Sequence, residues 1–320
     1  MSTQISAHIT EVYEKIKDNI GKVIVGKSDT IDMLIVSLLC GGHVLLEDVP
    51  GTGKTVLIKS LAASVSCEYK RIQFTPDLLP SDITGVNFFN MKKSEFEFVP
   101  GPIFANIVLA DEINRATPKT QSGLLECMEE IQATIDGKTF KLAQPFMVIA
   151  TQNPVESMGT FPLPEAQLDR FALKISMGYP TAEEEVNIIM ARRGFNPLDA
   201  VSQMLTIDDI RQLREFISGI KIDEQLYRYI VALITATRKH SKLALGASPR
   251  ASVALMRLAQ AYAFIRGRDY VLPDDIGSLF RSAVGHRLML RQEAKLANQS
   301  ADDILIEILR STDVPYHGKK

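Results

Sequence analysis

Short apolar runs alternate with stretches of helical periodicity over residues 1 to about 180 of this chain. Four of these runs are strand candidates, at residues 44–46, 69–74, 107–110 and 146–150. Apolar residues at successive positions are typical of strands buried on both faces, as in a parallel sheet covered by helices. The pattern therefore predicts an α/β layer architecture with a parallel sheet for this part of the chain.

Two segments between these runs have patterns that favour hairpins. Residues 82–102 alternate aromatic and polar side chains, and residues 133–142 contain Asp136-Gly137, a dipeptide that favours a type I′ turn. We predict that both hairpins project from the sheet. The phenylalanines of the first hairpin are equally compatible with packing at its base and with a surface that contacts a partner.

Strand signals fade after residue 180, and the pattern from residue 206 to about residue 290 is helical throughout. Helix starts are predicted at Thr206, Ser248 and Leu272, where a capping residue or a following proline precedes a helical run. One more helix is expected around residues 301–309. The second part of the chain is thus predicted to be a small all-helical domain.

Composition narrows the class of protein. The 320 residues carry a formal net charge of −2, which gives no overall electrostatic footprint for nucleic acid or an anionic membrane. The three cysteines are widely spaced, and neither they nor the five histidines show metal-ligand spacing. The longest apolar stretch is too short to span a bilayer, and the N-terminus is typical of an amphipathic helix. We expect a soluble cytoplasmic protein.

The sequence DVPGTGKT at residues 48–55 follows the first predicted strand directly. A glycine-rich turn that leaves a buried strand and opens a helix presents backbone N–H groups to phosphate oxygens. Lys54 is expected to reach the β- and γ-phosphates, and the Thr55 hydroxyl is expected to bind Mg²⁺. Asp48 stands where the P-loop pattern has its first glycine, although Gly51 and Gly53 still allow a tight turn. The sequence predicts a nucleoside triphosphate site.

Two further elements follow predicted strands and carry polar side chains. Asp111 and Glu112 end the run at 107–110, so that one carboxylate is expected near Mg²⁺, mostly through water, and the other beside the attacking water. Asn153 follows the run at 146–150, where its amide is expected to hydrogen-bond the γ-phosphate or that water. These side chains predict hydrolysis rather than binding alone.

Two arginines are candidates for stabilising the transition state. Arg170 lies in FPLPEAQLDRF, and its guanidinium is expected at a γ-phosphate, with an ion pair to Asp169 or Glu165 as the alternative. Arg250 lies in GASPRA at the start of a predicted helix, where a positive charge is unfavourable for the helix dipole. We interpret this unfavourable position as a sign that Arg250 senses the γ-phosphate.

Together these segments resemble the AAA+ ATPases, and among them the MoxR family. The resemblance covers roughly residues 10 to 290 and depends on the motifs DVPGTGKT, VLADEINRA, ATQNP, FPLPEAQLDRF and GASPRA. It implies a P-loop NTPase core with a parallel sheet at residues 1–197, followed by a small helical lid domain at 198–320. In this scheme residues 82–102 are the helix-2 insert, and residues 133–142 are the hairpin before sensor 1.

The resemblance also implies roles for single residues. Asp111 and Glu112 are the Walker B pair, Asn153 is sensor 1, Arg170 is an arginine finger acting in trans, and Arg250 is sensor 2. ATP is expected to contact the adenine-binding pair Val25 and Gly26 and the P-loop. The P-loop residues are Pro50, Gly51, Thr52, Gly53, Lys54, Thr55 and Val56.

Members of this family are expected to form hexameric rings with ATP and Mg²⁺ as cofactors. They are expected to act as chaperone-like remodellers that mature partner complexes, metal insertion included, with partners that contain a von Willebrand factor A domain. A nucleic-acid motor or loader with the same inserts is an alternative, although only Lys92, Lys93 and Lys138 favour it. A magnesium-chelatase-type ATPase subunit and a nucleotide switch without turnover are also compatible with the P-loop.

Overall fold

The computed structural model describes residues 2–49, 51–153, 159–191 and 197–315. Its centre is a sheet of five parallel strands in the order β2-β5-β8-β1-β9. The strands are β1 (Val44–Glu47), β2 (Tyr69–Gln73), β5 (Ile107–Asp111), β8 (Met147–Gln152) and β9 (Leu173–Ile175). A parallel sheet of this kind confirms the predicted fold class.

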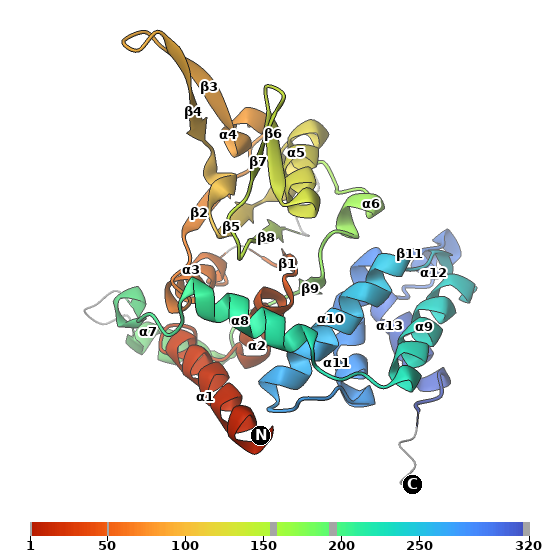
Figure 1. The fold of residues 1–320 in the computed structure, drawn as a ribbon. Helices are drawn as coiled ribbons and strands as arrows, with labels where there is room; N and C mark the ends of the chain where they lie inside the picture. The colour runs from red at the N-terminus through yellow and green to blue at the C-terminus, as the bar shows by residue number, and fades with distance from the viewer. Residues whose placement is uncertain (1, 50, 154–158, 192–196, 316–320) are drawn as a thin grey trace.

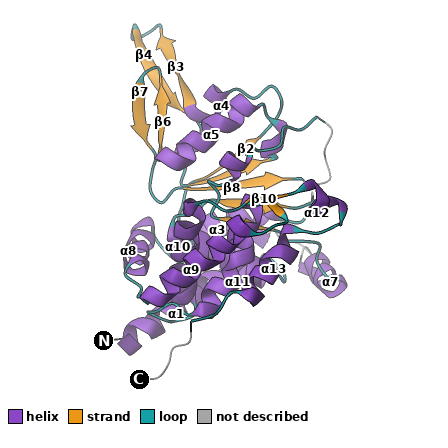
Figure 2. Ribbon diagram, turned by 90° about the vertical axis from the view of Figure 1, so that its right-hand side faces the viewer, coloured by secondary structure: helices purple, strands orange, loops and turns teal. Residues whose placement is uncertain are grey.

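Helices cover one face of this sheet, and the two hairpins lie with further helices on the other face (Figures 1 and 2). Successive side chains of a strand point to opposite faces, so Ile107 and Leu109 join one apolar cluster while Val108 and Ala110 join the other. The first cluster contains side chains of α1 (Ser2–Gly21), α2 (Ser28–Cys40) and α3 (Lys54–Ser64). The second contains side chains of α5 (Pro118–Glu130) and the neighbouring hairpin.

Both predicted hairpins are present and project from the same side of the sheet (Figure 2). One pairs β3 (Gly85–Asn90) with β4 (Glu95–Pro100), and the other pairs β6 (Gln132–Ile135) with β7 (Lys138–Lys141). Asp136 and Gly137 have φ values of +48° and +77°, as the central residues of a type I′ turn require. The phenylalanines divide: Phe98 stacks on Phe140 at the hairpin base, with ring centroids 4.4 Å apart, while Phe96 is exposed.

The expectation that residues 69–74 are buried on both faces is wrong. Lys70, Arg71 and Gln73 are exposed, because β2 is an edge strand that pairs only with β5 in this sheet. The three-residue strand β9 was not expected either. Nor was the two-stranded ribbon of β10 (Leu243–Leu245) and β11 (Met289–Leu290) in the helical part of the chain.

In the helical part of the chain, after residue 180, two of the predicted helix starts have a capping side chain. Thr206 caps the helix α8 (Ile207–Ser218), since its hydroxyl accepts a hydrogen bond from the Asp209 N–H at 3.2 Å. Ser248 caps another in the same way through the Arg250 N–H at 3.1 Å. The helices are α7 (Ala182–Ala191), α8 (Ile207–Ser218), α9 (Glu224–Lys239), α10 (Pro249–Ile265), α11 (Pro273–Val284), α12 (Gln292–Leu296) and α13 (Ala301–Ser311). Two short helices lie earlier in the chain, α4 (Pro80–Thr84) and α6 (Glu165–Leu168).

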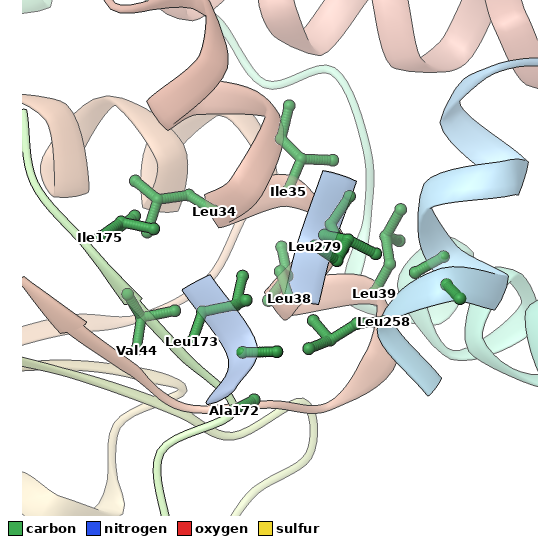
Figure 3. Packing of buried hydrophobic residues seen from close by; sticks show 14 of the residues in the cluster. Leu34, Ile35, Leu38, Leu39, Val44, Ala172, Leu173, Ile175, Leu258 and Leu279 are labelled. Atoms are coloured by element: carbon green, nitrogen blue, oxygen red, sulfur yellow. The ribbon is translucent and has the colours of Figure 1, made fainter. Parts of the chain in front are cut away.

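The apolar core is continuous across the predicted domain boundary at residues 197 and 198. Leu38 and Leu39 of α2 lie beside Leu173 of β9, Leu258 of α10 and Leu279 of α11 (Figure 3). The division into two domains stays a prediction, because the helical part and the sheet share this cluster. Among the described residues, no helix is both long enough and apolar enough to cross a membrane.

Candidate nucleotide site

The P-loop connects β1 to α3 through two glycines with positive φ. Gly51 has φ +84° and Gly53 has φ +88°, a region of backbone conformation that favours glycine. Gly53 is also the N-cap of α3, and among the described residues no side chain caps this helix. The first N–H groups of α3 are therefore available to phosphate oxygens. Pro50 lies outside the described residues.

Asp48 has a structural reason to replace the first glycine of the P-loop pattern. Its side chain is buried, with one carboxylate oxygen accepting from the Val49 N–H at 2.9 Å and the other from the Met177 N–H at 3.2 Å. The carboxylate thereby joins the P-loop to the segment that follows β9. Lys54 Nζ donates to the carbonyl oxygens of Asp48 and Val49 at 3.2 and 2.8 Å, so the ammonium group lies against the loop.

A cavity of about 380 Å³ lies at the carboxyl ends of the strands and brings most of the predicted residues together. In a parallel sheet this edge is the usual place for a ligand. The predicted residues in its lining are Gly51, Gly53, Lys54, Thr55, Val56, Asp111, Glu112 and Asn153. Thr52 lies in the same loop, where its hydroxyl donates to the Val49 carbonyl at 3.4 Å.

Thr151 holds Asp111 and Glu112, the predicted Walker B pair, in place. Its hydroxyl donates to Asp111 Oδ1 at 2.6 Å and accepts from the Glu112 N–H at 2.8 Å. Glu112 has φ +57°, which is uncommon for a residue with a side chain and costs about 1–3 kcal/mol. The hydrogen bond from the Glu112 N–H to the Thr151 hydroxyl helps to maintain this conformation.

Two residues of the edge strand β2 reach the same carboxylates. Arg71 donates to Asp111 Oδ2 from Nε at 3.0 Å and from Nη2 at 2.6 Å. Gln73 donates to Glu112 Oε2 at 2.8 Å, and Arg115 Nε lies 3.1 Å from the same oxygen. The negative charge of this cavity is thus already paired with side chains of the same chain.

Val25 and Gly26, expected at the adenine, are not in the lining of this cavity, and Gly26 lies beside Glu184 of α7. Lys27 Nζ donates to the Tyr179 carbonyl at 3.0 Å. At Gly26, which has φ +78°, an added Cβ would lie 1.9 Å from Glu184 Oε1, so a side chain would collide there. Their contact with adenine stays a prediction.

Arg170 and Arg250 are not brought to the P-loop of their own chain. Both line a second cavity of about 910 Å³ between the sheet and α10, which shares no described lining residue with the first. Arg170 Nε lies 2.8 Å from Glu129 Oε2, and Arg250 pairs with the other oxygen of the same carboxylate. Each arginine therefore has an acidic partner within the chain.

The alternative ion pair of Arg170 with Asp169 is not formed. Asp169 pairs instead with the buried Arg287, whose Nε lies 2.7 Å from Asp169 Oδ1. Its other oxygen accepts from the Ser248 hydroxyl at 2.7 Å. Arg287 also donates to the Phe171 carbonyl at 2.7 Å, so the segment around Arg170 is fixed to the start of α10.

The donor set fits a Mg²⁺ ion that arrives with a nucleotide. Among the described residues, no group of three or more His, Cys, Asp or Glu side chains is arranged to hold a metal. Thr55 and Asp111 line the same cavity and would hold the ion through side-chain oxygen atoms, and Mg²⁺ usually takes its other ligands from water and phosphates. Such an ion, when bound, would neutralise charge on the phosphates.

Comparison with known proteins gives the class to which this fold and site belong. The family model "ATPase family associated with various cellular activities (AAA)" matches residues 43–173, and the AAA lid domain model matches residues 235–308. A crystal structure from Cytophaga hutchinsonii superposes with a TM-score of 0.91 at 42% identity and covers 97% of each chain.

Two relatives cover nearly all of this chain. Uncharacterized protein YeaC of Bacillus subtilis is 50% identical over 301 residues, which are 94% of either protein. Chaperone MoxR1 of Mycobacterium tuberculosis is 43% identical over 304 residues, 92% of this chain and 80% of the relative. Protein MoxR of Paracoccus denitrificans is 31% identical over 84% of this chain. The chain belongs to the MoxR family of AAA+ ATPases.

Several residues in or beside the two cavities were not expected from the sequence. Arg71, Gln73 and Thr151 contact the Walker B pair, and Glu129 contacts both arginines. Only Thr151 carried a usable signal, because it lies in ATQNP at the end of a predicted strand. The other three become neighbours of the site through strand order and helix packing.

Proposed function

We propose that this protein hydrolyses ATP to ADP and phosphate and uses the cycle to remodel or mature partner protein complexes. One observation carries the hydrolysis: Lys54, Asp111, Glu112 and Asn153, which come from three different strand ends, line one cavity. In this proposal Lys54 and the N–H groups of α3 hold the β- and γ-phosphates, and Asn153 orients the water or the γ-phosphate. Glu112 polarises the attacking water.

Arg170 and Arg250 complete the site from a second copy of the chain. Their distance from the P-loop of their own chain supports action in trans, because both line a cavity that shares no lining residue with the nucleotide cavity. Two different surfaces would then meet between neighbouring copies. Repeated contacts of this type close into a ring when the rotation permits, and we propose a hexamer.

A protein client is favoured over nucleic acid by the surface of the first hairpin. Phe89, Met91 and Phe96 of this hairpin are 51%, 85% and 73% exposed, which is a poor surface for a phosphate backbone. Lys93, one of the few basic residues there, is paired with Glu97. The relative named Chaperone MoxR1 supports a chaperone-like role, and we propose a client with a von Willebrand factor A domain.

Hydrolysis is tested by replacing Glu112 with glutamine, which removes the charge that polarises water and keeps the shape. We expect ATP turnover to fall on the order of a hundredfold or more, while ATP binding is retained. Turnover is measured as phosphate release and binding by equilibrium dialysis, with Glu126→Gln, an exposed residue of α5, as the control. Turnover by Glu112→Gln at the wild-type rate would contradict the assignment.

The same variant tests the client. Glu112→Gln is used to capture partners from native lysate with ATP or with ADP. Retention of a protein with a von Willebrand factor A domain only in ATP would support remodelling. Retention of nucleic acid would support the motor instead.

A further inference from the structure

Glu129 joins the two arginines that we assign to a neighbouring subunit's nucleotide. Arg170 Nε donates to Oε2 at 2.8 Å, and Arg250 Nη2 donates to Oε1. The two arginines come from segments 80 residues apart, one after α6 and one in the first turn of α10. A single carboxylate therefore makes the two guanidinium groups converge.

Helix electrostatics alone would not place these charges where they are. Glu129 is in the last turn of α5, where the dipole disfavours a negative charge, and Arg250 is in the first turn of α10, where it disfavours a positive one. The contact between the two side chains compensates both unfavourable positions. Arg250 thus has an acidic partner in its own chain, and an anion from outside would have to replace that partner.

The backbone around the arginines does not depend on Glu129. Asp169, the residue before Arg170, is held by Arg287 at 2.7 Å and by Ser248 at 2.7 Å, and Ser248 is the N-cap of α10. These contacts fix both arginine-bearing segments without any contribution from Glu129. Replacing Glu129 should consequently change the electrostatics of the arginines more than their position.

The geometry points to an exchange of anions. The side chains of Arg170, Glu129 and Arg250 are 26%, 29% and 53% exposed and line the larger cavity, so an incoming ligand can reach them. Two guanidiniums bound to the two oxygens of a carboxylate can bind two oxygens of a phosphate in the same way. We propose that Glu129 is an internal counterion that binds the guanidinium groups of Arg170 and Arg250 and is exchanged for the terminal phosphate of a nucleotide bound to a second copy of this chain.

This proposal rests on the proposed function, and it predicts whether Glu129 raises or lowers the affinity for ATP. Binding of ATP between two copies must break both ion pairs with Glu129, so Glu129 weakens the apparent affinity of the assembled protein for ATP. Partly exposed ion pairs are individually weak, so the effect of two of them amounts to a factor of about three to ten.

The test compares Glu129→Gln with Glu130→Gln, the exposed neighbour at the end of the same helix. Steady-state hydrolysis is measured against ATP concentration with the assembled full chain. In Glu129→Gln we expect the half-saturating ATP concentration to fall about three- to tenfold, with kcat within about twofold of wild type. Glu129→Asp keeps the charge, so its half-saturating ATP concentration should lie closer to that of wild type. Glu130→Gln should have the same half-saturating ATP concentration as wild type.

A double-mutant comparison separates exchange from a general structural effect. ATP binding is measured in the background Arg170→Ala with Arg250→Ala, where Glu129→Gln should no longer change the affinity. If Glu129→Gln raises the ATP affinity by the same factor when both arginines are alanine, the proposal is overturned. An unchanged or higher half-saturating ATP concentration in Glu129→Gln alone would also overturn it. Full hydrolysis by Arg170→Ala would overturn the role of the arginines and this proposal together. Failure of the Glu129 exchange alone is thereby distinguished from failure of the proposed function.

Discussion

The Thr151 hydroxyl connects two strands of the sheet at the point where the predicted chemistry takes place. It lies at the end of β8 and contacts the last residue of β5 and the residue after it. Thr151 is buried, and its hydroxyl is the hydrogen-bond partner that the fold supplies for the Glu112 N–H. The position of Glu112 therefore depends on a side chain that takes no part in the proposed reaction.

Replacing Thr151 with valine, which keeps the shape and removes the hydroxyl, tests this dependence. The unsatisfied Glu112 N–H costs about 1–3 kcal/mol, part of which is relieved when the loop moves. We expect kcat for ATP hydrolysis to fall about tenfold, which corresponds to ~1.4 kcal/mol, with little change in ATP affinity. Thr151→Ser keeps the hydroxyl and should remain close to wild type. Equal kcat for the valine and serine variants would contradict the assignment.

The sequence predicts those site residues whose place in the fold follows from their own position in the chain. Asp111 and Glu112 directly follow an apolar run, and Lys54 and Thr55 end the glycine-rich turn that follows another, so the strand ends locate them. Glu129 could not be found in this way, because an acidic residue in the last turn of a helix has no signal until Arg170 and Arg250 are brought to it. Contacts across 41 and 121 residues depend on tertiary packing.

Two buried histidines connect secondary-structure elements. His43, just before β1, accepts from the Val148 N–H of β8 through Nδ1 at 3.0 Å, and its Nε2 lies 3.1 Å from the Met128 carbonyl of α5. His286 Nε2 lies 3.0 Å from the Phe171 carbonyl. Burial lowers the pKa of His43 to about 4 and that of His286 to about 3. Both are therefore neutral in the folded protein at moderately acidic pH.

Acidification should consequently destabilise the fold. A histidine in the unfolded chain takes up a proton below about pH 6.5, whereas these two stay neutral in the folded chain until about pH 4 and below. The free energy of unfolding should thus fall as the pH drops from about 6.5 to about 4, by ~1.4 kcal/mol per pH unit for each histidine. Urea unfolding at several pH values measures this slope.

Variants test whether the pH dependence of the free energy of unfolding comes from these two histidines. His43→Gln and His286→Gln should each flatten the pH dependence of the urea midpoint between about pH 6.5 and 4, whatever their effect at neutral pH. His240→Gln, at a partly exposed position on the helical part, is the matched control. A slope that is unchanged in both buried variants would show that other groups cause it.

The elements themselves were largely predictable where their patterns are long or carry turn chemistry. The type I′ turn at Asp136-Gly137 and the capped start of α8 at Thr206 are examples. Strand β9 was missed because three residues are too few to show a period, and the exposure of β2 was missed because strand order decides which strand is at the edge. Strand order is a property of the folded sheet and has no local signal.

The whole molecule carries the two parts of the proposed active site on different sides. Figure 1 shows α3, which begins at the P-loop, and α6, which precedes Arg170, on opposite sides of the sheet. In the proposed arrangement one chain does not complete its own site, and a contact between unlike surfaces of two copies completes it. An open row of copies would leave one incomplete site at its end, whereas a closed ring would leave none.

If each hydrolysis site is built from two copies of the chain, two inactive variants can restore activity when they are mixed. Lys54→Ala keeps the arginines, and Arg170→Ala keeps the P-loop, so each variant alone should be inactive in hydrolysis. In randomly mixed assemblies of equal amounts, about one site in four joins an intact P-loop to an intact arginine. Phosphate release should then recover to about a quarter of the wild-type rate, and no recovery would contradict action in trans. In a cell, two loss-of-function alleles of this gene would complement each other, so a genetic test of allelism would wrongly place them in two genes.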